Sequence, residues 1–365
     1  MKILTVVSGL DFINYTRRAT ISAIHKLNPG MDVLQYNSIL NIRKKKNRSP
    51  GIKFFNFHFW IPEKLRGLKF LIVLEVFIRK QYWKGFFSKY DYIFLIDPNQ
   101  YYLLPFLSGK HKVIYLLRDP SILLDPLSYK KEYAILKRAD LVLGISQNLC
   151  EYYLRKYYDF VPSRVKLWSN TVDLELWDYE NLKYGLIEKK KPLIGFAGNI
   201  DFVIDIELLL FITEKLSEYD FEIAGKTDRH SIDNNAWQKL ISRDNVRYLG
   251  FIPYNEFPAV VIRWDIGLVV AKPEHEYARY LNNNKQYQYL ALGKPFVTYR
   301  LNADYDDFED MVFIAENRED YLVKIDEALE RANKINARES GLRIARRNSS
   351  MERAELFLEY LKQIN

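Results

Sequence analysis

The sequence predicts an α/β protein with two doubly wound parallel sheets, and two copies of one pattern support this prediction. The apolar run Lys2–Val7 ends in a glycine turn, and the helical segment Phe12–Leu27 follows it. The pattern restarts at Pro192–Asn199, after the polar segment Tyr179–Lys191. Continuous apolar runs that end in turns are typical of parallel strands buried on both faces. Strands that alternate with helices in this way form doubly wound sheets.

We therefore expect two Rossmann-like domains that face one cleft. The first domain would span residues 1–180, residues 181–191 would form a linker, and the second domain would span residues 192–344. The C-terminal helix, approximately residues 345–365, is expected to return to the first domain.

The other expected elements follow in the same alternating order. The strands are Met31–Tyr36, Asp91–Pro98, Lys112–Leu117, Ala139–Ser146, Val165–Trp168, Phe221–Lys226, Val246–Gly250, Ile266–Val270, Phe296–Tyr299 and Met311–Ala315. The helices are Tyr129–Arg138, Gln147–Tyr157, Asp205–Ser217, Glu319–Ile335 and Arg338–Leu361.

Charge is divided unevenly between the two halves. Residues 1–191 carry 32 lysines and arginines against 17 acidic residues, an excess of 15 positive charges, whereas the remainder carries 22 against 29. A strongly basic half indicates an anionic partner, either nucleic acid or an anionic membrane surface. The only cysteine is Cys150, and no apolar run reaches the length of a bilayer span. We therefore expect a protein without disulfides that is soluble or peripheral to a membrane.

The region from Arg43 to Trp83 has two interpretations. A basic loop precedes an aromatic cluster and then the apolar segment Leu65–Trp83, which basic residues flank. Such a segment suits a helix that lies in the plane of a membrane interface. A core helix with a solvated basic face explains the same pattern equally well. The candidate membrane or acceptor contacts are Arg43, Lys44, Lys45, Lys46, Phe57 and Trp60.

The segment Asn282–Pro295 predicts a polar loop, a short helix, a glycine stop and a strand that begins at Pro295. The free N–H groups of the first helical turn and the nearby Lys285 suit an anion such as a diphosphate. An ordinary helix with a solvated lysine is the alternative. Asp119 follows a predicted strand of the first half, where ligands of open α/β sheets bind. Its carboxylate is a candidate catalytic group, although a helix or turn cap is the alternative.

Several motifs together resemble those of glycosyltransferases of the GT-B fold. In the second half these are Ile194–Asn199, Phe221–Lys226, Asn245–Tyr254, Trp264–Leu268 and Lys285–Pro295, and in the first half they are Arg138–Ser146 and Asn170–Asp173. The set is similar above all to bacterial envelope and exopolysaccharide enzymes, such as xanthan glucuronosyltransferase and the teichuronic acid glycosyltransferases. The resemblance covers the second half nearly from end to end.

The resemblance implies transfer of a hexosyl-type sugar from a nucleotide-diphosphate sugar, UDP being favoured over GDP, to a lipid-linked saccharide or other envelope polysaccharide. It implies no cofactor and no metal. The donor-binding residues would be Gly198, Asn199, Lys226, Asn283, Asn284, Lys285 and Gln288. The catalytic base would be Asp119, with Asp11 and Asp125 as the other candidates. The protein would work in the cytoplasm, peripherally at the inner face of the cell membrane.

Two departures from the family pattern bear on the mechanism. The family's glutamate near the donor ribose is Gln288 here, and the acid expected eight positions earlier is Tyr280. The second change favours inversion of the sugar's configuration. A nucleotide-sugar 2-epimerase of the same fold is the alternative enzyme. A nucleic-acid-binding protein is the alternative without activity, but no nucleic-acid motif accompanies the basic loop.

Overall fold

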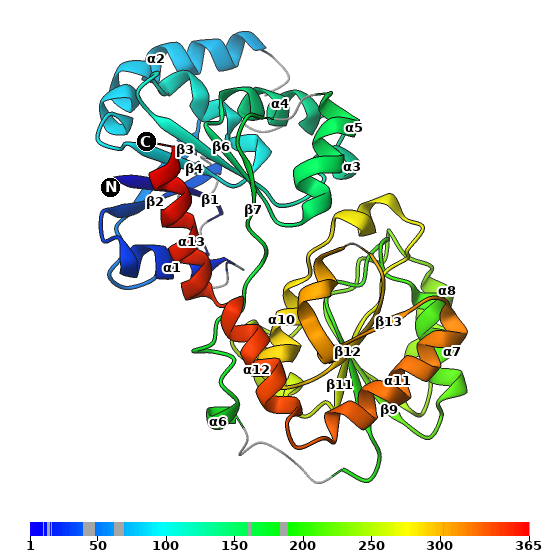
Figure 1. Ribbon diagram of the computed structural model, residues 1–365. Coiled ribbons are helices and arrows are strands. Elements are labelled where there is room, and N and C mark those ends of the chain that lie inside the picture. The colour runs from blue at the N-terminus through cyan, green and yellow to red at the C-terminus, as the bar shows by residue number, and fades with distance from the viewer. Residues whose placement is uncertain are drawn as a thin grey trace. The chain divides into compact units, whose positions relative to one another are not determined.

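The computed structural model describes residues 1–9, 11, 12, 15, 17–38, 48–61, 69–159, 162–182, 189–301 and 303–364. The chain divides into two compact units, shown in Figure 1. Unit 1 comprises Met1–Ser169 and Arg353–Asn365, and unit 2 comprises Asn170–Glu352. The expected linker lies within unit 2, and its residues 183–188 are outside the described part of the chain.

Unit 1 contains a seven-stranded parallel sheet in the order β3-β2-β1-β4-β5-β6-β7. The strands are β1 (Ile3–Ser8), β2 (Met31–Ser38), β3 (Phe54–Phe59), β4 (Tyr92–Leu95), β5 (Lys112–Leu117), β6 (Leu141–Gly144) and β7 (Val165–Leu167). Its helices are α1 (Arg18–Leu27), α2 (Lys69–Phe87), the 3-10 helix η3 (Pro98–Phe106), α3 (Ser121–Leu124), α4 (Ser128–Arg138), the π-helix η4 (Leu149–Tyr153) and α5 (Leu154–Tyr158). Sequential parallel strands and intervening helices make this a doubly wound sheet.

Two features of unit 1 differ from expectation. The predicted helix Phe12–Leu27 is shorter, because α1 begins only at Arg18. The aromatic cluster around Phe57 forms β3, an edge strand that pairs with β2 along its whole length. Aromatic side chains favour strands because they pack well on a pleated surface, and Phe57 is accordingly buried.

Unit 2 contains a six-stranded parallel sheet in the order β10-β9-β8-β11-β12-β13. The strands are β8 (Leu193–Ala197), β9 (Asp220–Ala224), β10 (Val246–Gly250), β11 (Ile266–Val269), β12 (Phe296–Tyr299) and β13 (Val312–Ala315). Its helices are α6 (Tyr179–Leu182), α7 (Ile206–Lys215), α8 (Asn234–Ile241), α9 (Phe257–Val261), the 3-10 helices η6 (Glu276–Tyr280) and η7 (Ala303–Met311), α10 (Asn284–Ala291), α11 (Arg318–Ala332) and α12 (Ala337–Arg347). The prediction of two doubly wound α/β units is therefore confirmed.

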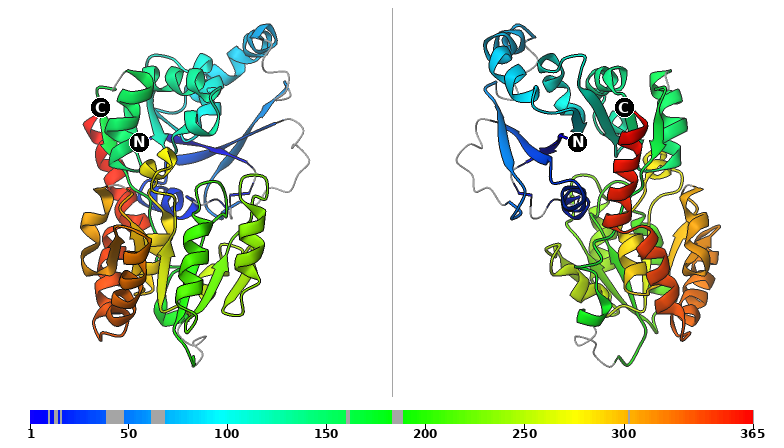
Figure 2. Two further views of the ribbon diagram at one scale, coloured as in Figure 1. Left: turned by 90° about the vertical axis from the view of Figure 1, so that its right-hand side faces the viewer. Right: turned by 60° about the vertical axis from the view of Figure 1, so that its left-hand side comes forward.

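The predicted helix Arg338–Leu361 is wrong as a single element, because it is broken into α12 and α13 (Ser350–Gln363). At the break Val172 pairs with Ser349, and the Ser350 N–H donates to the Val172 carbonyl oxygen over 3.0 Å. Helix α13, red in Figures 1 and 2, then packs on unit 1. The Phe357 ring lies 4.8 Å from Phe94 and 5.8 Å from Trp168 between ring centres. The expected return of the C-terminal helix is therefore confirmed.

Candidate functional site

A candidate site in unit 2 is formed by two glycine loops at the carboxyl edge of its sheet. Gly198 follows β8 and Gly225 follows β9, with φ angles of 148° and 152°. A Cβ atom at Gly225 would stand 1.7 Å from the carbonyl oxygen of Gly198, so only glycine permits this approach. The Gly198 N–H donates to Ala224 and the Ile200 N–H donates to Lys226, each over 2.9 Å. The two loops therefore lie side by side.

Lys285 brings a positive charge to these loops. A Cβ atom at Gly198 would stand 2.7 Å from the Lys285 Nζ, which shows how closely the ammonium approaches the glycine. The Nζ also lies 4.5 Å from the centre of the Phe196 ring. Burial lowers the Lys285 pKa to about 8, and the negative charge of Asp201 only partly offsets this. An anion placed here would favour the charged ammonium and raise this pKa again.

Tyr289 fixes the position of α10, and with it Lys285. Its hydroxyl accepts the Ala197 N–H over 3.2 Å and donates to the Leu268 carbonyl oxygen over 3.3 Å, so it joins the ends of β8 and β11. Its ring lies against β11, where a Cβ atom at Gly267 would stand 2.3 Å from it. Lys285 stands four residues earlier on the same face of the helix. The glycine in β11 therefore lets α10 approach the sheet closely enough for Lys285 to reach Gly198.

The structure brings the other predicted donor residues to the same edge. Asn199 and Lys226 are exposed in the two paired loops, and Asn283 and Asn284 form the start of α10. The Asn283 side chain does not cap the helix. Gln288 lies one turn after Asn284 and is buried.

The loop before α10 is tied to the point where the chain enters unit 2. The Asn170 N–H donates to the Asn282 Oδ1 over 3.0 Å, and the Asn170 Nδ2 donates to the Asn282 carbonyl oxygen. The Tyr287 hydroxyl donates to the Asn282 Oδ1 over 3.1 Å. These amide contacts hold the polar loop in place, although sequence patterns alone did not pair the two segments.

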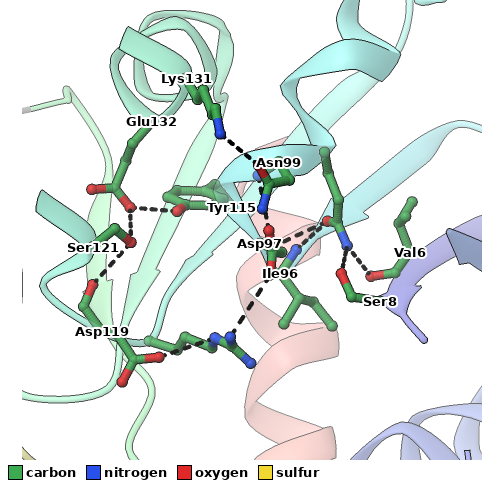
Figure 3. Close-up of polar contacts among 12 residues, drawn as sticks. Val6, Ser8, Ile96, Asp97, Asn99, Tyr115, Asp119, Ser121, Lys131 and Glu132 are labelled. Atoms are coloured by element: carbon green, nitrogen blue, oxygen red, sulfur yellow. Dashed lines mark hydrogen bonds and ion pairs between the residues drawn. The ribbon is translucent and has the colours of Figure 1, made fainter. Parts of the chain in front are cut away.

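Unit 1 has a candidate site of its own at the carboxyl edge of its sheet, shown in Figure 3. Gln100 joins two strand ends there: its Oε1 accepts the Ile96 N–H over 2.7 Å, and its Nε2 donates to the Val6 carbonyl oxygen over 3.0 Å. Asp97 follows β4, and its Oδ1 accepts the Asn99 N–H over 2.8 Å. Gln100 is fully buried, so this edge is held by satisfied hydrogen bonds.

Asp119 follows β5 at this edge and pairs with its neighbour. The Arg118 Nε lies 3.1 Å from the Asp119 Oδ2, and the Arg118 Nη2 lies 3.7 Å from the Asp97 Oδ2. The Asp119 side chain keeps 31% of its surface exposed. Asp119 thus combines a fixed position with access to solvent, as a general base requires. Burial by itself lowers the Arg118 pKa, but the charges of Asp119, Tyr15 and Asp97 together raise it.

Glu132 supports the Asp119 loop from inside the protein. Its carboxylate accepts hydrogen bonds from Tyr115, Tyr158, Tyr153 and Ser121 over 2.5, 2.6, 2.8 and 3.1 Å. Burial raises the Glu132 pKa, while these four hydroxyl groups oppose the rise. The Ser121 N–H in turn donates to the Asp119 carbonyl oxygen over 2.8 Å. Figure 3 shows the Ser121 hydroxyl between the Glu132 carboxylate and the Asp119 carbonyl oxygen, to which it donates over 3.5 Å.

The other two candidate bases are also in unit 1. Asp125 lies between α3 and α4, and its Oδ1 accepts the Leu127 N–H over 2.9 Å, so it serves as a turn cap. Asp11 is exposed after β1.

The predicted membrane contacts fall into three groups. Arg43, Lys44, Lys45 and Lys46 lie outside the described residues. Trp60 is 47% exposed, whereas Phe57 is only 1% exposed. Phe57 is therefore a core residue beneath α2 and not a surface contact.

No helix among the described residues is long and apolar enough to cross a membrane. In the same part of the chain, no three His, Cys, Asp or Glu side chains gather as a metal site would require.

Sequence analysis missed the residues that support the site. The missed residues hold the strand ends or lie near Asp119 and Lys285; they are Gln100, Arg118, Glu132, Phe196 and Asp201. A signal existed for Glu132, because it shares the buried face of α4 with Ser128, Ile135 and Leu136 at helical spacing. A carboxylate on a buried face needs partners, and the nearby tyrosines were available.

The chain resembles proteins of known structure and one family model. Residues 207–359, less than half of the chain, match a family described as glycosyl transferase-like. No curated protein sequence matches the chain. The structure of Anabaena HepE in complex with UDP and glucose aligns at 13% identity and a TM-score of 0.70, covering 100% of both chains. The sucrose-phosphate synthase of Thermosynechococcus elongatus aligns at 16% identity and a TM-score of 0.73, covering 99% of this chain and 98% of the other.

Two further structures bear on the alternatives. The lipopolysaccharide outer core galactosyltransferase WaaB aligns at 14% identity and a TM-score of 0.69, covering 100% of this chain and 99% of the other. The UDP-GlcNAc 2-epimerase of Neisseria meningitidis aligns at 14% identity with a lower TM-score, 0.60, covering 100% of both chains. At such identities the likeness establishes the fold alone. The chain therefore has the two-domain GT-B fold that its motifs predicted, and over residues 207–359 its sequence is glycosyl transferase-like.

Proposed function

We propose that this protein is a glycosyltransferase that takes a hexosyl-type sugar from a nucleotide-diphosphate sugar. The observation that carries the proposal is the approach of the Lys285 ammonium to the Gly198 loop in unit 2. A partly buried cation beside glycine loops and the N-terminus of a helix suits the diphosphate of a donor. The match of residues 207–359 to a glycosyl transferase-like family supports the same assignment. UDP is the favoured nucleotide, since HepE was solved with UDP and glucose.

The proposed reaction is an inverting transfer without a metal. Asp119 accepts the proton of an acceptor hydroxyl, and that oxygen forms a bond to the anomeric carbon of the sugar. The bond from this carbon to the diphosphate oxygen breaks, and its electron pair leaves with the diphosphate. Lys285 and the N–H groups at the start of α10 stabilise the charge that develops there. Donor binding would include Asn199, Lys226, Asn283, Asn284 and Gln288.

The proposed acceptor is a lipid-linked saccharide or another envelope polysaccharide, and the proposed place of action is the inner face of the cell membrane. The excess of 15 positive charges in residues 1–191 supports an anionic surface as partner. The likeness to a lipopolysaccharide galactosyltransferase is in keeping with such an acceptor.

A panel of nucleoside diphosphates tests the donor part of this proposal. We expect one of UDP, GDP, ADP or CDP to raise the melting temperature of the wild-type protein, and Lys285→Ala to remove the effect. Lys294→Ala is the matched control, because burial also lowers the Lys294 pKa to about 8. Lys294 precedes β12 and so lies at the opposite, amino edge of the same sheet. No stabilisation by any of the four nucleotides would contradict the proposal.

A 2-epimerase is the second candidate, because two enzymes of this name share the fold. Both align less closely than the transferases do, at TM-scores of 0.57 and 0.60. Incubation with UDP-GlcNAc alone separates the two activities. An epimerase would convert the sugar without any acceptor, whereas the proposed transferase would not.

A further inference from the structure

Helix α2 turns an apolar face away from the rest of unit 1. Six of its large side chains are more than half exposed, with exposed fractions from 52% for Leu74 to 79% for Phe77. This α2 apolar face consists of Phe70, Val73, Leu74, Phe77, Ile78 and Tyr82. Their spacing of three, four, seven, eight and twelve residues from Phe70 places them on one side of the helix. Figures 1 and 2 show α2 at the periphery of unit 1.

The side of α2 that faces the protein carries an ion pair beside the buried Trp83, Phe86 and Phe87. Glu75 and Arg79 are both buried and form an ion pair of 2.5 Å. The Arg79 Nη1 donates to the His58 carbonyl oxygen over 2.8 Å, and the Glu75 Oε1 accepts the Trp60 N–H over 3.1 Å. The guanidinium also lies 4.5 Å from the centre of the Phe57 ring. A rotated helix would break these contacts and leave buried charges unpaired, so the pair holds the apolar face outward.

An exposed apolar face of this size indicates a contact with a partner. Contiguous apolar patches on soluble proteins mark contacts with proteins or membranes, whereas single exposed residues need no explanation. The face is one continuous stripe along the helix, and Trp60, 47% exposed, follows β3 beneath it. The partner must therefore offer an apolar surface.

The charges around the face indicate which partner this is. Exposed Lys80 stands seven residues after Val73 and exposed Lys84 seven after Phe77, so both continue the stripe toward the end of α2. The only acidic residue of α2 is Glu75, which is buried. A second copy of this chain would bring the same lysines to the contact and no exposed acid from α2 to pair with them. An anionic lipid surface offers both the apolar layer and the negative charge.

We propose that the α2 apolar face inserts into the interface of an anionic membrane, with the helix axis in the membrane plane and Lys80 and Lys84 at the headgroups. This inference deepens the proposed function and rests on it only for the identity of the acceptor. No described helix could cross a bilayer, which leaves the in-plane orientation for α2. A transferase held in this way would meet lipid-linked acceptors at the surface where they lie.

Vesicle flotation tests the inference without any substrate. We expect the wild-type protein to bind vesicles of phosphatidylcholine mixed with phosphatidylglycerol more strongly than vesicles of phosphatidylcholine alone. Phe77→Ser should weaken binding about tenfold, because a large side chain no longer leaves water. Replacing Lys80 and Lys84 with serine should weaken binding about fivefold for each lysine, on the anionic vesicles only. The matched control is Phe251→Ser, since Phe251 is 70% exposed but lies in unit 2.

A fluorescent label locates the contact. Cys150 is the only cysteine and is buried, so Ile78→Cys provides a single accessible thiol. An environment-sensitive dye at this position should brighten when anionic vesicles are added, whereas the same dye on Phe251→Cys should not. Equal responses of the two labelled proteins would overturn the inference.

Two other results would also overturn it. One is equal vesicle binding by the wild-type protein and Phe77→Ser. The other is a wild-type dimer in solution that Phe77→Ser converts to a monomer, which would make the face a contact between two copies. Circular dichroism of each variant controls for folding, and exposed Phe77 should leave the melting temperature nearly unchanged. Vesicle binding without sugar transfer would leave the inference standing and contradict only the proposed function.

Discussion

The two units place different charged groups at the same edge of the same kind of sheet. At the carboxyl edge of unit 2, Lys285 meets glycine loops, and Asp201 is the carboxylate that acts on it electrostatically. At the carboxyl edge of unit 1, Asp119 and Asp97 share Arg118 between them. Both sheets are parallel and doubly wound, so topology does not cause this difference. The side chains that follow the strands decide the chemistry of each edge.

The supports of the two edges differ as well. In unit 2 the edge depends on glycines, because the absence of a side chain lets Lys285 and Tyr289 approach the strands closely. In unit 1 the support is a network of hydrogen bonds, from Glu132 to Ser121 and from Gln100 to two strand ends. An anion site of backbone N–H groups needs close approach, whereas a base needs a carboxylate held in one direction. Variants at the unit 1 edge should therefore lose turnover, whereas variants at the unit 2 edge should lose donor affinity.

The largest effect is expected at the unit 1 edge. Asp119→Asn should lower turnover by about 10²–10⁴-fold, because an amide cannot take the acceptor proton. Donor affinity should stay unchanged, since the base acts on the acceptor. Steady-state rates and nucleotide titrations of the same protein separate the two quantities. Asp125→Asn is the matched control, because its carboxylate already caps a turn. Full activity of Asp119→Asn, with loss of activity in Asp125→Asn or Asp11→Asn, would assign the base to another carboxylate.

The next largest effect is expected at the unit 2 edge. Lys285→Ala should weaken nucleotide diphosphate binding about 10–150-fold, the equivalent of losing a charge-assisted contact of about 1.5–3 kcal/mol. The fold should persist, because α10 keeps its Tyr289 contacts with β8 and β11. Isothermal titration of the folded variant measures the change. An affinity equal to that of the wild-type protein would remove Lys285 from the donor site.

A smaller effect is expected behind Asp119. Glu132→Gln replaces an acceptor oxygen with an amide that donates, so it disturbs the four hydroxyl groups that now point at Glu132. Turnover should fall about tenfold and the free energy of unfolding by about 1–3 kcal/mol, with donor affinity unchanged.

Glu222 provides the control for this variant. It is also buried, and it accepts from Trp264 over 2.8 Å and pairs with Arg263 at 3.1 Å in unit 2. Glu222→Gln should lower stability without a comparable loss of turnover at a temperature where both variants are folded. Equal losses of turnover would show that Glu132 contributes to stability alone.

The fold could be predicted because parallel strands leave a continuous apolar signal. The runs that became β1, β8 and β12 are apolar and end in turns. Strand β3 was missed because its aromatic residues follow a basic loop, although Phe55, Phe57 and Phe59 alternate as strand residues do. The break between α12 and α13 depends on pairing with Val172, far away in the sequence, which a local pattern does not contain.

Of the candidate site residues, only those beside recognisable turns could be predicted from the sequence. Lys285 and Asp119 stand next to recognisable turns, whereas Gln100 and Glu132 act through partners that folding brings together. Helix α2 shows the same limit. Its apolar residues surround the helix almost completely, so periodicity could not show that Glu75 and Arg79 face inward. Only the contacts of the buried ion pair decide this orientation.

The smallest effect is expected for two lysines of unit 2, Lys285 and Lys294, which lie at opposite edges of the sheet but carry the same charge. Burial lowers the pKa of both Lys285 and Lys294 to about 8, below the value near 10.4 of an unfolded chain. Between these two values the unfolded state binds more protons, so stability rises as pH increases from about 8 to 10. At pH 7 each buried ammonium therefore costs free energy. Lys285→Met and Lys294→Met should each stabilise the protein by about 1–3 kcal/mol at pH 7, and the gain should vanish near pH 10. Urea denaturation at both pH values measures this, and only Lys285→Met should lose donor affinity.

In the wild-type protein the donor affinity should itself decline as pH rises above about 8, because the Lys285 ammonium loses its charge. Stabilisation by Lys294→Met alone would mean that Lys285 already has an anionic partner in the free protein, and the contrast between the two sheet edges would then disappear.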